Sequence, residues 1–194
     1  MSWEHILVII SALIIIPGVS VYIRDTLKGK TKPNLVTWSM WTLAPLIGAA
    51  AAISAHADPW VVVRIFLAGF LPLLVLISAF INPQSHWKIT IFDILCGLCS
   101  ILALGIWLII DSPIYAILLA AIGDGFAALP TIIKAWKFPE TETVFTYIMS
   151  LFSVLLVIPS IPHWNIENSA FQVYLILVNL ILIAVVFRKR LKFW

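Results

Sequence analysis

An acidic residue lies inside a long apolar segment of this sequence. Asp124 stands between Gly123 and Gly125, and Pro130 follows in the same segment. Counted from residue 113, where the segment begins, Asp124 lies about 16 Å along a helix, near the middle of a hydrocarbon layer about 30 Å thick. A carboxyl group at that depth must pair, face a cavity or stay protonated. Asp124 is therefore a candidate for solute contact or proton exchange; the alternative is a neutral side chain that packs against a neighbouring backbone.

A second polar side chain is predicted at the same depth. Asn179 lies about 14 Å into the last apolar segment, so it could share a ligand with Asp124. The alternative is an amide that joins two helices by a hydrogen bond. Arg64 lies about one turn into the segment 60–81 from its outer end, where it could extend outward to the interface or inward toward Asp124.

Aromatic and hydroxyl residues of two further segments complete the candidate site. Trp41 is predicted to lie deep enough to stack against a planar ligand, although packing in the core explains it equally well. Ser150 and Ser153 occupy the corresponding segment of the second half. Trp38 is expected at the membrane interface, as part of an aromatic belt.

Glycine and proline residues in the Asp124 segment are expected to allow close packing and bending. Gly123 and Gly125 remove bulk beside the acid, which lets a helix or ligand approach. Pro130 removes a helical hydrogen bond and allows a bend. Pro17 and Pro45 are candidate hinges of the same kind, although proline is also simply more common in membrane helices.

Composition requires that these segments lie in a membrane. Hydrophobic residues make up 62% of the 194 residues and charged residues 11%, too little polar surface for a soluble protein of this size. The first apolar segment is interpreted as a retained helix, since it lacks a basic leader. We expect an all-α integral membrane protein whose seven transmembrane helices cover residues 5–24, 34–55, 60–81, 90–110, 113–134, 143–160 and 170–188.

The basic residues predict an orientation for these spans. Of the 12 Lys and Arg residues, all but Arg64 fall on one side of a seven-span model, whereas the alternate connections hold Asp58, Asp111 and Glu167. Because cytoplasmic loops carry the excess of positive charge, the N-terminus is predicted outside and the C-terminus in the cytoplasm of a cell, most simply at a bacterial inner membrane. The positive charge is assigned to orientation and lipid, with no nucleic acid as partner.

The two halves of the sequence resemble each other. Pro17 precedes Arg24 by the same interval as Pro130 precedes Lys137, and "LVTWSM" at 35–40 aligns with "VFTYIM" at 144–149. The prediction is a parallel repeat, with one membrane domain over 1–194. Residues 1–82 and 112–188 form two three-helix bundles, 88–111 a linker helix (3+1+3), and 189–194 a basic tail. Chance similarity of two apolar helix pairs is the alternative.

This pattern of proline, basic loop and Thr-aromatic opening, repeated across seven spans, resembles the PQ-loop and SWEET-type transporters. Gly18 and Thr131 stand where that family usually has glutamine. The resemblance implies two bundles around a central pathway, with Pro17, Pro45 and Pro130 as hinges and with assembly into a homo-oligomer left open. It also implies a membrane transporter or facilitator of a small polar solute, such as a sugar or an amino acid, with proton coupling left open.

Other chemistries lack a pattern in the sequence. Cys96 and Cys99 form C-x-x-C in an apolar setting, where they are interpreted as small buried residues. There is no zinc spacing, phosphate-binding loop or nucleophile–base set, so neither enzyme activity, metal nor cofactor is predicted. A receptor or structural membrane protein of the same fold that does not transport is the alternative function.

Overall fold

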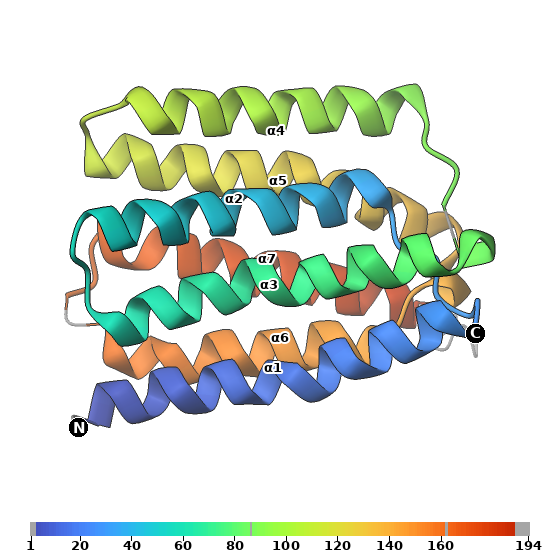
Figure 1. Ribbon diagram of the computed structural model, residues 1–194, viewed down its shortest axis with the longest axis horizontal. Helices are drawn as coiled ribbons and strands as arrows, with labels where there is room; N and C mark the ends of the chain where they lie inside the picture. Colours follow the sequence, from blue (N-terminus) through green and yellow to red (C-terminus); the bar gives the residue numbers. More distant parts are fainter. Residues whose placement is uncertain (1–2, 86, 162, 189–194) are drawn as a thin grey trace.

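The computed structural model describes residues 3–85, 87–161 and 163–188. Its regular elements are helical (Figure 1). They are α1 (Trp3–Leu27), α2 (Leu35–Ser54), α3 (Pro59–Ile81), η1 (Pro83–Ser85), α4 (Ile91–Ile109), α5 (Pro113–Lys137), η2 (Pro139–Thr141), α6 (Val144–Val157), η3 (Ile158–Ser160) and α7 (Ile166–Phe187). The basic tail predicted for 189–194 lies outside the described residues.

Within the described residues, six helices are long and apolar enough to cross a membrane: α1, α2, α3, α4, α5 and α7. The remaining one, α6, has 14 residues and continues into η3. Large apolar side chains are exposed along the helices, for example Leu102 at 65% and Ile109 at 81% on α4. A contiguous apolar surface of this kind is unusual on a soluble protein. The chain therefore has the architecture of a multi-pass membrane protein.

Local sequence signals set several helix ends. Gly29 adopts a positive φ of 71° just after α1, a conformation that glycine adopts without a steric cost. The Asn34 side chain accepts a hydrogen bond from the Thr37 backbone N–H and so starts α2. Thr90 and Asp93 form a capping box at the start of α4. Asp93 therefore helps to start α4.

Successive helices run in opposite directions along the bundle (Figure 1). One end holds the α1–α2, α3–α4 and α5–α6 connections, which contain Lys28, Lys30, Lys32 and Lys88. We call it the basic end. The other end holds the start of α1 and the α2–α3, α4–α5 and α6–α7 connections, with Asp58 and Asp111.

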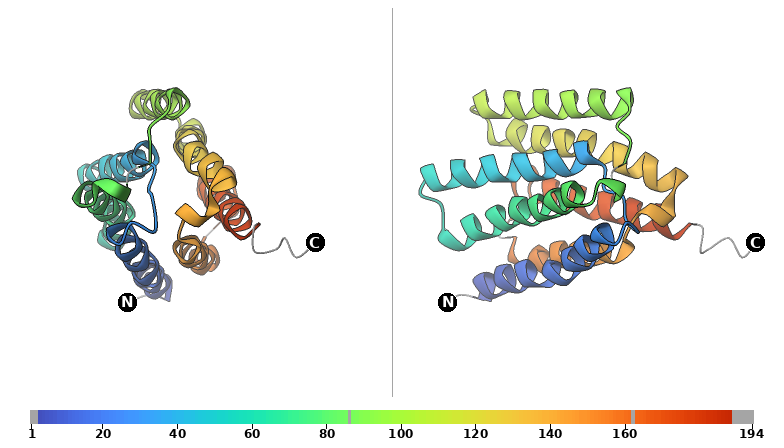
Figure 2. Two further views of the ribbon diagram at one scale, coloured as in Figure 1. Left: turned by 90° about the vertical axis from the view of Figure 1, so that its right-hand side faces the viewer. Right: turned by 45° about the vertical axis from the view of Figure 1, so that its right-hand side comes forward.

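Neighbouring helices pack in a connected set. The α3 helix contacts α1 and α2, and α7 contacts α5 and α6. Two further contacts join these groups, α1 with α6 and α2 with α5. The α4 helix packs on α5 and α2 at one margin of the bundle (Figure 2).

The buried core contains aromatic rings from several helices. Tyr22 of α1 lies 4.7 Å from Trp38 of α2, measured between ring centroids, and Trp38 meets Trp41 edge-on at 5.3 Å. Tyr147 of α6 belongs to the same core. Trp38 is only 3% exposed, so the prediction that it belongs to an interface belt is wrong. The Tyr22 ring and the core residues around it cover the ring that sequence position alone would assign to the lipid interface.

The three candidate hinge prolines lie inside helices that continue through them, Pro17 in α1, Pro45 in α2 and Pro130 in α5. Pro17 is exposed on the surface of the bundle and Pro130 is fully buried. The two related positions therefore differ in their surroundings.

Candidate functional site

The Asp124 carboxyl group is held between helices. The Tyr174 hydroxyl of α7 donates a hydrogen bond to Asp124 Oδ2 at 2.6 Å. Trp41 of α2 interacts with the same carboxyl group. We call Asp124, Tyr174 and Trp41 the Asp124 site. It combines one acid, one hydroxyl and one indole, contributed by α5, α7 and α2, so a shift of any of these helices would change its geometry.

The glycines beside Asp124 allow this convergence. A Cβ atom at Gly123 would lie 3.1 Å from the Ala103 Cβ of α4, so the missing side chain permits α4 and α5 to pack closely. A Cβ atom at Gly125 would lie 3.7 Å from the Tyr174 ring, at ordinary contact distance. The expectation that a helix approaches the backbone beside the acid is confirmed at Gly123. Gly125 faces the ring that binds the acid.

Asn179 is buried but satisfied within its own helix. Its Nδ2 donates to the Leu175 carbonyl of α7 at 2.8 Å, and it is 5% exposed. The Asp124 carboxyl is instead bound by Tyr174, one turn and a residue earlier on α7. The sequence does not distinguish Tyr174, because a tyrosine in an apolar helix has no distinctive pattern.

The remaining candidates lie on α6 and α3, which contribute no residue to the Asp124 site. Ser153 donates from Oγ to the Ser11 carbonyl at 2.8 Å and thereby links α6 to α1. Ser150 is half-buried one turn earlier on α6. Arg64 is half-buried on α3, and the described residues form no ion pair with it.

A second polar group is buried at the basic end. Lys134 of α5 forms an ion pair with Glu142, and both side chains are almost completely inaccessible. Lys134 Nζ also donates to the Lys32 carbonyl. Glu142 Oε2 accepts hydrogen bonds from the Tyr22 hydroxyl at 3.0 Å and from the Tyr147 hydroxyl at 2.7 Å. We call these five residues the Lys134–Glu142 cluster.

The η2 turn explains how this cluster forms. Pro139–Thr141 reverses the chain after α5, so that Glu142 returns toward the last turn of the helix that carries Lys134. The sequence assigns the charge of Lys134 to the loop charges that set orientation, but the side chain is buried and paired. A Lys in an apolar helix, followed across a proline turn by a Glu, is the sequence signal that could have predicted the pair.

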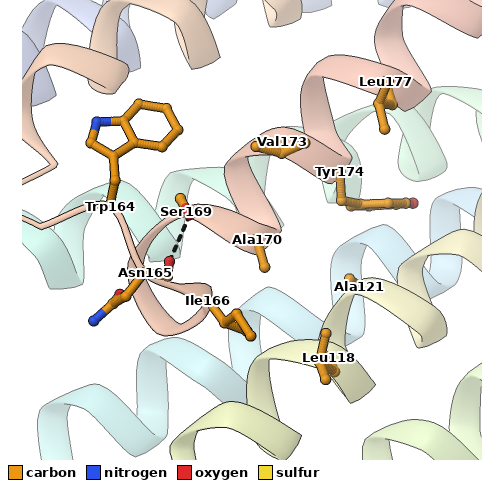
Figure 3. Close-up of a pocket in the computed structure, with 10 residues that line it drawn as sticks. All are labelled: Leu118, Ala121, Trp164, Asn165, Ile166, Ser169, Ala170, Val173, Tyr174 and Leu177. Carbon is orange, nitrogen blue, oxygen red and sulfur yellow. Dashed lines mark hydrogen bonds between the residues drawn. The ribbon is translucent and has the colours of Figure 1, made fainter.

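An open groove of about 630 Å³ lies between α5 and α7 toward the other end (Figure 3). Its lining is mainly apolar and includes Leu118, Val173 and Leu177, which are exposed. Tyr174 also lines it, so one residue belongs both to the groove and to the Asp124 site. The Ser169 hydroxyl at its margin bonds to the Asn165 carbonyl at 2.6 Å.

Among the described residues, no group of three or more His, Cys, Asp or Glu side chains is arranged to hold a metal ion. The C-x-x-C cysteines are free thiols, Cys96 buried and Cys99 half-buried. No protein-family model, curated protein or solved structure matches the chain. Function is therefore inferred from the residues and their geometry.

Proposed function

We propose that the protein is a membrane transporter or facilitator of a small polar solute, with Asp124 as its solute contact or proton acceptor. The observation that carries the proposal is the Asp124 site. An acid deep in an apolar helix is bound by Tyr174 of α7 and faced by Trp41 of α2. Ionisable groups at such depth are costly and usually belong to solute or proton pathways.

The helix contacts support a two-unit arrangement of 3+1+3. In this proposal α1–α3 and α5–α7 are the units and α4 is the linker. In each unit the third helix contacts the first and the second. Between the units, α1 contacts α6 and α2 contacts α5, and a twofold axis that relates the units would convert one of these contacts into the other. Seen along the helices, α1–α3 lie on one side and α5–α7 on the other (Figure 2). Parallel repeats of this kind often enclose a central solute site.

The orientation follows from the same proposal. The basic end carries the Lys-rich connections, so we assign it to the cytoplasm, with the N-terminus outside. The Asp124 site then lies between the two membrane surfaces.

Ligand binding and flux test the function. The purified protein would be screened by thermal shift against pooled sugars, amino acids and other small metabolites, because a ligand of the folded state raises the unfolding temperature. Hits would then be assayed as labelled solutes entering liposomes that contain the protein. Binding and uptake that both require Asp124 support a transporter.

Two outcomes favour other functions. Binding without flux favours the receptor or structural alternative, and product formation without flux favours an enzyme.

A further inference from the structure

We propose that the Lys134–Glu142 cluster is a latch that closes the basic end of the protein over a polar vestibule, and that its ion pair opens during the transport cycle. This inference rests on the proposed function. The latch differs in residues and position from the Asp124 site.

The latch joins the two units of the proposed repeat. Tyr22 and Lys32 belong to the first unit, whereas Lys134, Glu142 and Tyr147 belong to the second. Further bonds reinforce the junction, from the Lys32 N–H to the Thr141 carbonyl at 2.9 Å, between the Thr31 and Thr143 hydroxyls, and from Thr143 to Asp25 at 3.3 Å. At the opposite end, the His5–Asp58 contact joins two elements of the same unit.

Polar atoms without partners lie beside the latch. Within the described part of the chain, Thr26 Oγ1, Asn34 Nδ2 and Thr131 Oγ1 are buried and form no hydrogen bond. Thr26 and Thr131 each lie about one turn from a latch residue, and Asn34 is two residues beyond Lys32. Buried polar groups normally have partners, because an unmade hydrogen bond is costly. A second conformation in which water or solute reaches these atoms would give them hydrogen-bond partners. In that conformation the three atoms would line the vestibule.

The energetics of a buried ion pair suit a latch. Removing one partner leaves an unpaired buried charge, which destabilises the closed form strongly. When the intact pair opens, water hydrates both charges. Opening therefore costs less free energy than keeping a single unpaired charge buried, as in a variant that lacks one partner. A single neutralisation should therefore shift the population toward the open form.

Reactivity of a cysteine placed behind the latch tests this directly. Both native cysteines are first removed by Cys96→Ala and Cys99→Ala. In this background Thr131→Cys reports on the basic end, and Ser11→Cys reports on the N-terminal half of α1. Both positions are fully buried. The full-length protein in detergent is treated with a polar maleimide. With Glu142→Gln, the Thr131→Cys thiol should react on the order of tenfold faster or more, whereas Ser11→Cys should react no faster than before.

Three further variants make the test specific. Glu140→Gln neutralises an exposed acid of the same turn and should leave both rates unchanged. Tyr147→Phe removes one hydrogen bond to Glu142 while the ion pair remains, so it should raise the Thr131→Cys labelling rate less than Glu142→Gln does. Lys134→Met/Glu142→Gln removes both charges and keeps an acceptor for the tyrosines, and should return the Thr131→Cys rate to within about threefold of the original.

The outcomes separate the latch from the transport proposal. Unchanged Thr131→Cys rates in both Glu142→Gln and Tyr147→Phe overturn the latch, and so does equal acceleration at Ser11→Cys, which indicates general loosening. The labelling assay needs no solute, so a positive labelling result beside a failed flux experiment supports an ion pair that opens at the basic end but contradicts its role in a transport cycle.

Discussion

Asp124 is the residue whose protonation state the proposed mechanism would use. Tyr174 donates to one carboxyl oxygen at 2.6 Å, and that bond can form with either protonation state. A solute that binds one state more tightly must couple its binding to a proton, because only differential affinity can shift an equilibrium. The Asp124 site thus offers a simple route to proton coupling.

We predict that Asp124→Asn abolishes the pH dependence of uptake while the protein still folds. Asparagine has nearly the volume of protonated aspartate, and its amide oxygen can still accept from Tyr174. Asp124→Ala should also weaken solute binding, because Tyr174 then loses its acceptor. Uptake into liposomes at several pH values, with thermal-shift binding in parallel, measures both effects. If Asp124→Asn keeps the original pH dependence and affinity, Asp124 is a packing residue.

At the scale of elements, the close contact between α1 and α6 depends on the residue at position 18. A Cβ atom at Gly18 would lie 2.8 Å from Met149 Cβ and 3.1 Å from Thr146 Cα. The Thr146 hydroxyl also donates to the Gly18 carbonyl at 2.7 Å. A glutamine at position 18 would therefore collide with α6, so this packing requires glycine.

Gly18→Ala should destabilise the protein by about 1–3 kcal/mol, the usual cost of overpacking. Gly105→Ala is a matched control, because nothing lies within 4 Å of a Cβ atom there, and it should be neutral or slightly stabilising since alanine favours helix. Thermal unfolding in one detergent compares the two variants. Equal unfolding temperatures would mean that α1 and α6 separate easily at this point.

The proline hinges give a kinetic prediction at the same scale. Pro17 is exposed on α1, so Pro17→Ala should slow transport severalfold while binding and folding stay nearly intact. Pro130 is buried, and Pro130→Ala should slow transport but also alter packing. Initial uptake rates, compared with thermal-shift affinities, separate hinge from packing. Loss of binding and stability in step with the rate at Pro17 would assign it a structural role.

At the scale of the whole molecule, composition and the length of the apolar segments predicted the helices well. The predicted spans agree with the observed helices within a few residues at most ends, because apolar length and capping residues such as Asn34 and Thr90 are local signals. The long-range partners could not be predicted in the same way. Tyr22, Tyr147 and Glu142 meet only through tertiary packing, and Trp41 reaches Asp124 only because α2 packs on α5.

The α6 helix is short, and whether it crosses the membrane decides whether the protein has six spans or seven. Its 14 α-helical residues and the three residues of η3 together extend about 27 Å, slightly less than a hydrocarbon layer of about 30 Å. A deficit of this size is met by local thinning of the bilayer at a modest cost. We therefore expect α6 to cross, which makes the number of spans odd.

A pair of topology reporters tests this count. A reporter fused to the C-terminus should report the cytoplasm, and one inserted at Asn165, between α6 and α7, should report the exterior. As a control, an insertion at Ala57, between α2 and α3, should also report the exterior, since the same end of the bundle holds both connections. If the Asn165 and C-terminal reporters lie on one side while Ala57 lies on the other, the seven-span model and the repeat that depends on it are both wrong.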